Sequence, residues 1–146
     1  MSAQEIEQCF PRLVHEGYEE TSPEDNTYNC IAWAGDDNQE KWDPDITTGR
    51  HWPQNVPRTL ELSSFIALYA VEGGYVPCQN GELEPGFEKI AIFLNLAREV
   101  EHASKQLPDG TWTSKLGDWE DITHKAPSSL EGNIYGTVAQ FLKRPR

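Results

Sequence analysis

Apolar residues recur at helical spacing in the segment RTLELSSFIALYAVEGG. Leu62, Phe65, Ile66 and Tyr69 follow steps of three and four residues, which places them on one face of a helix. The pair Gly73-Gly74 ends the pattern, as glycine commonly does at a helix C-terminus. We therefore expect a helix that packs one face on the core.

The hydrophobic period changes to that of strands after this helix. FEKIAIFLN reads as one strand and EVEHASKQL as a second, and PDG is a tight turn into a third strand, TWTSKLG. These segments predict a three-stranded antiparallel meander between Glu88 and Gly117. The later segment YGTVAQFLKR fits either a final strand or a helix.

The first third of the chain predicts short helices joined by irregular segments. AQEIEQCF favours a short helix, and CIAWAG favours another that stops at Gly35. The segment from Asp36 to Pro57 holds three prolines and two tryptophans without a period, so we expect a long loop. The fold class is therefore α+β, with helices first and a small antiparallel sheet after them, in a single domain over residues 1–146.

Charge and composition exclude several classes of function. Twenty-four acidic and twelve basic residues give a formal charge of −12, which disfavours binding to nucleic acid or anionic lipid. The N-terminus lacks the pattern of a signal peptide and no segment reaches membrane-spanning length, so we expect a cytoplasmic protein. Cys9, Cys30 and Cys78 have no CxxC spacing, and no HExxH motif is present, so we expect reduced thiols, no metal and no cofactor.

Cys30 is the first candidate for chemistry because it opens a predicted helix. A helix N-terminus favours the thiolate, which is the nucleophilic form of cysteine. His102, on the second predicted strand, is the candidate general base and then acid. Asp118 is the candidate that orients the imidazole. Ser114, Asp121 and His124 remain open as alternatives for that third position.

Further candidates concern the substrate. Asn29 or Asn26, together with the amide of Cys30, would donate hydrogen bonds to a developing oxyanion. Trp52 and Trp112 are candidates for the walls of a substrate groove, although tryptophans are more often core residues.

Two motifs carry a resemblance to a known group of enzymes. NCIAWA resembles the start of the nucleophile helix in the papain-like clan, and HASKQLPDGTWTSKLGD is similar to the arrangement of histidine strand, hairpin and aspartate in its cell-wall endopeptidase and transglutaminase-like members. The chain also resembles a small bacterial family of uncharacterised proteins. The clan resemblance implies a papain-like core and acyl transfer through a thioester on Cys30, with His102 as its partner. It implies an amide, peptide or isopeptide bond as substrate.

A second hypothesis gives the same fold no catalytic role. In this interpretation the chain is an acidic binding module for a basic protein, the loop from Asp36 to Pro57 is its contact surface, and Cys30 is a core residue.

Overall fold

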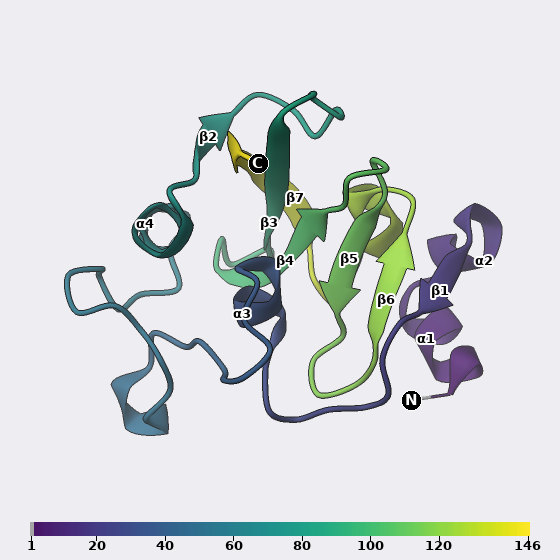
Figure 1. Ribbon diagram of the computed structural model, residues 1–146. Helices are drawn as coiled ribbons and strands as arrows, with labels where there is room; N and C mark the ends of the chain where they lie inside the picture. The colour runs from purple at the N-terminus through teal and green to yellow at the C-terminus, as the bar shows by residue number, and fades with distance from the viewer. Residues whose placement is uncertain (1) are drawn as a thin grey trace.

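Seven antiparallel strands form one sheet at the centre of the molecule (Figure 1). The structure is a computed structural model in which residues 2–146 are described. The strand order is β1-β6-β5-β4-β3-β7-β2. The strands are β1 (Tyr18–Glu20), β2 (Val76–Cys78), β3 (Phe87–Leu94), β4 (Val100–Gln106), β5 (Trp112–Lys115), β6 (Asp121–His124) and β7 (Thr137–Pro145). The helices are α1 (Ala3–Cys9), α2 (Arg12–Glu16), α3 (Cys30–Ala34) and α4 (Leu62–Gly73), with the 3-10 turns η1 (Ile46–Thr48) and η2 (Pro127–Leu130). The α+β class is confirmed.

The predicted meander is confirmed as β3-β4-β5. The undecided segment near the C-terminus is a strand, β7, which pairs with β3 from Phe87↔Pro145 to Leu94↔Thr137. The three- and four-residue strands β1, β2 and β6 were not expected, because such short segments carry little periodicity. The predicted sheet is thus the middle of a wider one.

Strand β3 is buried on both of its faces. Ile90 and Ile92 point into one hydrophobic core, whereas Ala91 and Phe93 point into another. Since side chains alternate along a strand, a strand covered on both faces has a continuous run of apolar residues, which matches IAIFL at residues 90–94. We call the side of Ile92 the first face of the sheet and the side of Phe93 the second face.

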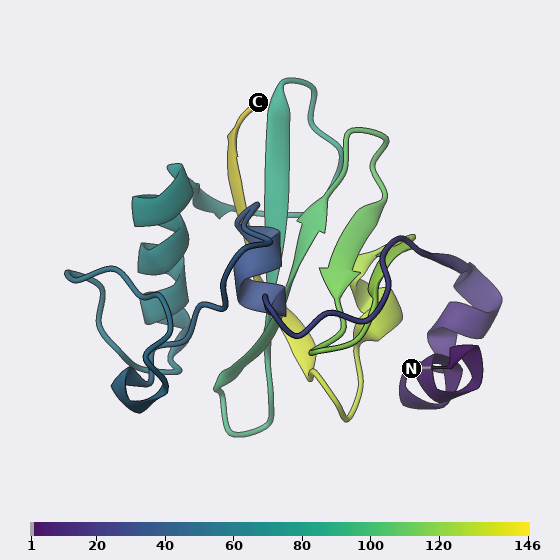
Figure 2. The same ribbon diagram turned by 60° about the horizontal axis from the view of Figure 1, so that its bottom comes forward.

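Helices cover each face of the sheet. On the first face, α3 and α4 pack with residues of the long loop around Ile90 and Ile92. Figure 2 shows α3 in front of the strands and α4 beside it. On the second face, residues of α1, α2 and η2 pack around Phe93. The sheet therefore separates two cores.

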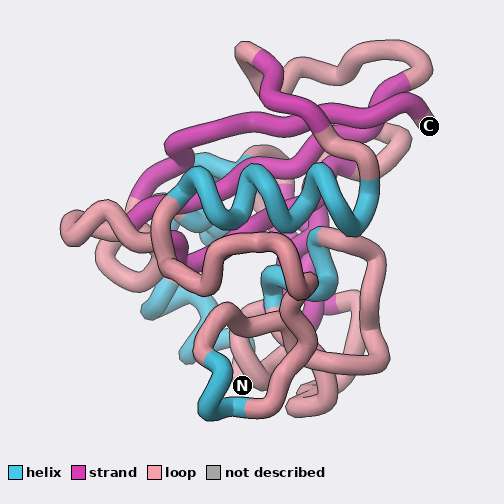
Figure 3. Tube along the Cα trace, turned by 90° about the vertical axis from the view of Figure 1, so that its left-hand side faces the viewer, coloured by secondary structure: helices cyan, strands magenta, loops and turns pink. Residues whose placement is uncertain are grey.

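The predicted helix near residue 62 is confirmed as α4, which ends at Gly74 in a left-handed conformation with φ of 71°. In Figure 3 it lies in front of the strands, with loops below it. The long loop between α3 and α4 is irregular, as predicted, apart from η1 and a bridge between Trp42 and His51. Trp42 and Trp52 of this loop are buried in the first core, so the loop is anchored by its aromatic side chains.

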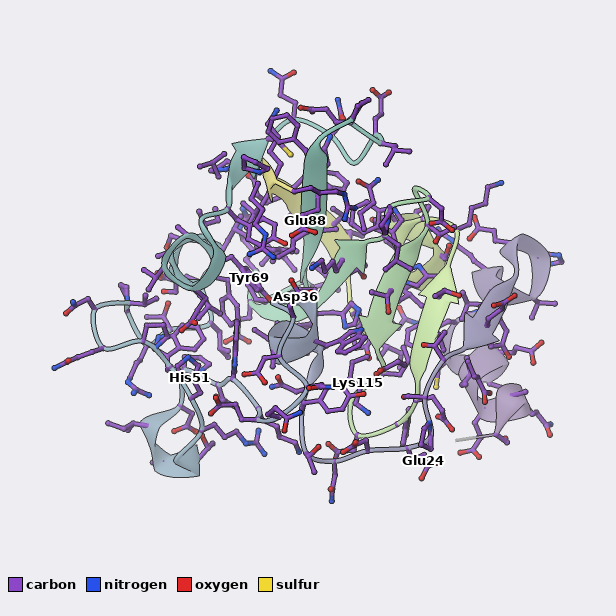
Figure 4. The ribbon with its side chains drawn as sticks, viewed as in Figure 1. Glu24, Asp36, His51, Tyr69, Glu88 and Lys115 are labelled. Carbon is purple, nitrogen blue, oxygen red and sulfur yellow. The ribbon has the colours of Figure 1, made fainter. Side chains whose placement is uncertain are left out.

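An ionic cluster attaches the end of α3 to the sheet. Glu88 accepts a hydrogen bond of 2.5 Å from Arg144 Nε, and Arg144 also donates to Asp36 at 2.7 Å. Lys105 pairs with Asp36 and lies 3.6 Å from Glu88. Figure 4 shows Asp36 and Glu88 close to each other at the centre of the molecule. Glu88 and Lys105 are the buried members of this cluster, and each has a partner of opposite charge, as the burial of a charge requires.

Three lysines are buried in or against the sheet: Lys89, Lys105 and Lys115. The ammonium of Lys89 donates to the carbonyl of Asn80 at 3.0 Å, and that of Lys115 donates to the carbonyl of Trp119. Each buried ammonium thus has an acceptor, as burial of a charge requires.

No helix in the described part of the chain is both long enough and apolar enough to cross a membrane.

The loop between η2 and β7 packs closely against the backbone at the end of β3. Gly136 has φ of 78°, and a side chain there would collide with the carbonyl of Leu94. Gly86 has a similar φ of 83°, with open space around it. We expect Gly86→Ala to lower the free energy of unfolding by about 1 kcal/mol through backbone strain. Gly136→Ala adds overpacking and should lower it by about 3 kcal/mol or more.

Urea unfolding of the two glycine variants, followed by circular dichroism, measures this difference. Equal losses of stability in both variants would contradict the close contact at Gly136.

Candidate active site

Cys30 is the first residue of α3, and Asn29 caps this helix. The side-chain oxygen of Asn29 accepts from the amides of Ala32, at 3.1 Å, and Trp42, at 3.2 Å. An asparagine in this position satisfies an amide at the helix start. The sequence prediction of a cysteine at a helix N-terminus is confirmed.

The thiol of Cys30 is protonated at neutral pH. Desolvation raises its pKa to about 11, and the nearby charge of Glu101 acts in the same direction. The backbone amides of Ala103, Ile31 and Cys30 itself oppose the shift without cancelling it. The expectation that the helix start would favour the thiolate is therefore wrong for this state, because burial outweighs the dipole of a five-residue helix.

His102 is completely buried on the second face of the sheet. Its ring stacks on Tyr135, with centroids 3.9 Å apart and planes at 9°, and the Phe93 ring lies at 5.1 Å. Burial, and to a lesser extent the neighbouring His124, lower the pKa of His102 well below its ordinary value. The imidazole is neutral at pH 7.

A chain of hydrogen bonds joins His102 to β5 and β6. The hydroxyl of Ser114 lies 3.1 Å from Nε2 of His102, 2.6 Å from the hydroxyl of Ser104 and 2.8 Å from Nε2 of His124. Nδ1 of His124 lies 2.8 Å from the carbonyl of Ala126. We call His102, Ser104, Ser114 and His124 the buried network.

The network fixes the position of each proton. A carbonyl only accepts, so Nδ1 of His124 carries a hydrogen; its pKa is lowered to about 4 by burial, and Nε2 is therefore a bare acceptor. Ser114 has a single hydroxyl hydrogen and donates it to this nitrogen. Ser104 and His102 must then both donate to Ser114. His102 accordingly carries its hydrogen on Nε2, which leaves Nδ1 with a free lone pair.

Nδ1 of His102 is a buried atom without a hydrogen-bond partner among the described residues. Buried polar atoms are rarely left in this state, and each exception needs an explanation. The network therefore leaves one unprotonated nitrogen without a hydrogen-bond partner inside the described structure.

Cys30 and His102 meet the same stretch of β4 but pack in different cores. The sulfur lies 3.9 Å from the carbonyl oxygen of Glu101, and the amide of Ala103 also acts on it, so it contacts the residues on either side of His102. Its side chain packs with the first core, whereas the imidazole packs with Phe93 in the second. No hydrogen bond joins thiol and imidazole in the described structure, and their catalytic pairing stays a prediction.

Asp118 does not orient His102. It lies in an exposed turn and accepts from Lys41 at 2.8 Å. Asp121, an alternative, accepts from the hydroxyl of Tyr28 at 2.6 Å. The side chain that hydrogen-bonds to His102 is that of Ser114, another of the predicted alternatives. Ser114 in turn hydrogen-bonds to His124, a further alternative. Asp118 follows the hairpin in sequence, but the turn after β5 carries it beyond the buried network.

Asn29 and Asn26, the predicted oxyanion donors, make other contacts. Nδ2 of Asn29 donates to the carbonyl of Trp42 at 2.8 Å, because the side chain is committed to capping α3. Asn26 lies in an exposed acidic depression with Asp25, Asp118 and Trp119. Neither asparagine is directed at the thiol by a hydrogen bond in the described structure.

The two tryptophans are core residues and do not wall a groove. Trp52 is buried in the first core and donates to the carbonyl of Val56 at 3.1 Å. Trp112 is buried in the second core, near Phe141. Their large apolar surfaces stabilise the opposite faces of the sheet.

Sequence reasoning missed Tyr135 and Ser104. Ser104 follows His102 by two residues in HASKQ, and strand alternation places both on one face, so this signal was present. Tyr135 lies within GNIYG, a glycine-bounded loop whose position over His102 depends on the bridge between Gly132 and Gly136. No local pattern in the sequence indicates that contact.

No group of three or more potential ligand side chains among the described residues is arranged to hold a metal ion.

Residues 19–143 match the family model described as "Domain of unknown function (DUF7689)". No curated protein and no solved structure matches the chain.

The neutral buried histidines predict a loss of stability in acid. Both pKa values lie below the ordinary 6.5, that of His124 at about 4, so the unfolded chain takes up protons first as the pH falls. Their contribution is complete above about pH 6.5 and decreases towards pH 4, by about 1.4 kcal/mol per pH unit for each histidine. His124→Asn should therefore reduce the loss between about pH 6.5 and about pH 5 by about 2 kcal/mol.

Urea unfolding across this pH range provides the measurement. His15→Asn is the control, because His15 is exposed. A pH dependence that His124→Asn leaves unchanged would show that His124 is not held neutral.

Proposed function

Since the chain belongs to the DUF7689 family, whose description assigns no activity, we propose its function from the geometry of this site. The protein is a cysteine hydrolase or acyltransferase that acts on an amide, peptide or isopeptide bond of a peptide or protein substrate. Cys30 is the nucleophile and His102 is the general base.

The free lone pair on Nδ1 of His102 is the observation that carries this proposal. A general base needs an unprotonated nitrogen, a fixed tautomer and a position near the nucleophile. The hydrogen bonds through Ser114 to His124 fix the tautomer of His102 with its hydrogen on Nε2. The thiol of Cys30 lies against the backbone on either side of His102, which supports the third requirement.

The proposed reaction starts from two neutral groups. Sγ of Cys30 attacks the substrate carbonyl while its proton passes to Nδ1 of His102. The imidazolium then protonates the leaving amine, which gives a thioester on Cys30. Water or an amine attacks the thioester, its proton passes to Nδ1, and the thiol is regenerated as the acyl product leaves.

This sequence requires the thiol to leave the Glu101 carbonyl and approach Nδ1 to hydrogen-bond distance. The amide of Cys30 is one of the first helical amides, which lack a partner within the helix, and we assign it to the oxyanion. A helix that begins with the nucleophile and packs on an antiparallel sheet, with the base on the central strand β4, also supports the proposal of a papain-like core.

The alternative function, a binding module that uses residues 36–57, has less support. Trp42 and Trp52 of that loop point into the first core, so the aromatic groups that would anchor a partner stabilise the fold instead.

Acetylation by p-nitrophenyl acetate tests the proposed activity. This ester accepts attack by a thiolate and releases coloured p-nitrophenolate, while the acetyl group stays on sulfur. We expect Cys30 to be acetylated at least about tenfold faster than Cys9 or Cys78, because general-base assistance typically contributes two orders of magnitude or more. Peptide mass spectrometry resolves the three cysteines.

Variants separate the roles in this assay. His102→Gln should slow acetylation of Cys30 about a hundredfold, and Ser114→Ala should slow it less, because the base remains but its tautomer is no longer fixed. Cys78→Ser is the control and should leave the rate at Cys30 unchanged. Equal acetylation of all three cysteines, or a rate at Cys30 that does not respond to His102→Gln, would overturn the proposed function.

A further inference from the structure

We propose that Glu101 selects substrates that carry a positive charge beside the reacting carbonyl. This inference rests on the proposed function, because it assigns a substrate class to the thiol of Cys30. Glu101 combines an exposed carboxylate with a backbone carbonyl 3.9 Å from that thiol.

A β-bulge places Glu101 at this point. Leu94 pairs with Val100 and Phe93 pairs with His102, so Glu101 is the extra residue of β4. A bulge interrupts the regular ladder and redirects the chain locally. It brings the Glu101 carbonyl to the sulfur, while its neighbour His102 points into the second core.

The carboxylate of Glu101 is held in place but not neutralised. Nδ2 of Asn95 donates to it at 2.8 Å. No basic side chain in the described structure forms an ion pair with it, whereas Asp118, Glu84 and Glu88 each have such a partner. A fixed, unpaired and exposed carboxylate attracts a cation from solution.

The charge of Glu101 reaches both parts of the site. Burial is the main cause of the raised pKa of the Cys30 thiol and of the Tyr135 hydroxyl, which covers His102, and the charge of Glu101 adds a smaller effect in the same direction to each. A substrate bound at Cys30 therefore lies within the field of this carboxylate. An ammonium or guanidinium group beside the scissile bond would be favoured there, and a carboxylate would be repelled.

The test compares two thiol reagents that differ in charge. Methanethiosulfonates ending in a trimethylammonium or in a sulfonate are similar in size, and both attach to a thiolate with loss of methanesulfinate. We expect the ratio of their rates at Cys30, cation over anion, to fall about threefold or more in Glu101→Gln. The ratio is informative because a change in the thiol's pKa alters both rates equally.

Matched variants and salt complete the experiment. Glutamine retains an oxygen that can accept from Asn95, so the local structure is kept. Glu99→Gln changes an exposed carboxylate of the same hairpin and should leave the ratio unchanged. High salt should reduce the ratio in the wild-type protein and have little effect in Glu101→Gln.

The outcomes distinguish this inference from the proposed function. A ratio that Glu101→Gln does not lower, an equal fall in Glu99→Gln, or a Cys30 that neither reagent reaches would overturn the role of Glu101. His102→Gln should slow both reagents and keep the ratio. If Cys30 selects the cation through Glu101 but is not acetylated in the ester assay, the charge selection stands and acyl transfer fails.

Discussion

The burial of β3 on both faces is the constraint on which the rest of the structure depends. Its side chains alternate between two cores, so helices must cover both sides of the sheet, with α3 and α4 on one side and α1 and α2 on the other. Strand β4 is paired to β3 and inherits the same alternation. The buried residues next to the bulge of β4 are consequently divided between the two cores: Ala103 shares its side with Ile92, and His102 shares its side with Phe93.

Competition between burial and electrostatics decides the chemistry of the site. The short helix α3 and nearby amides favour a thiolate at Cys30, yet desolvation prevails and the thiol keeps its proton. Burial likewise keeps His102 neutral. Two neutral groups are suited to a reaction in which a proton moves during attack, whereas a resting ion pair would require an environment that stabilises both charges.

The sequence predicted those parts of the molecule that depend on local patterns. The period of α4, the meander and the cysteine at the start of α3 each follow from neighbouring residues. The predicted roles of Asp118 as the orienting residue and of the tryptophans as groove walls were wrong, because the positions of these side chains depend on contacts distant in sequence. Asp118 accepts a hydrogen bond from Lys41, and Trp112 packs in the second core. The tautomer of His102 depends on Ser114 and His124, which only the assembled sheet brings together.

The buried lysines alter how the molecule presents its charge to its surroundings. Lys89, Lys105 and Lys115 lie inside the protein, whereas most of the carboxylates remain outside. The electrostatic potential at the surface is accordingly more negative than it would be if the formal charge of −12 were distributed uniformly. At low ionic strength two copies with this net charge repel each other before they touch, and burial of the three lysines removes cations from the surface that could otherwise attract a second copy.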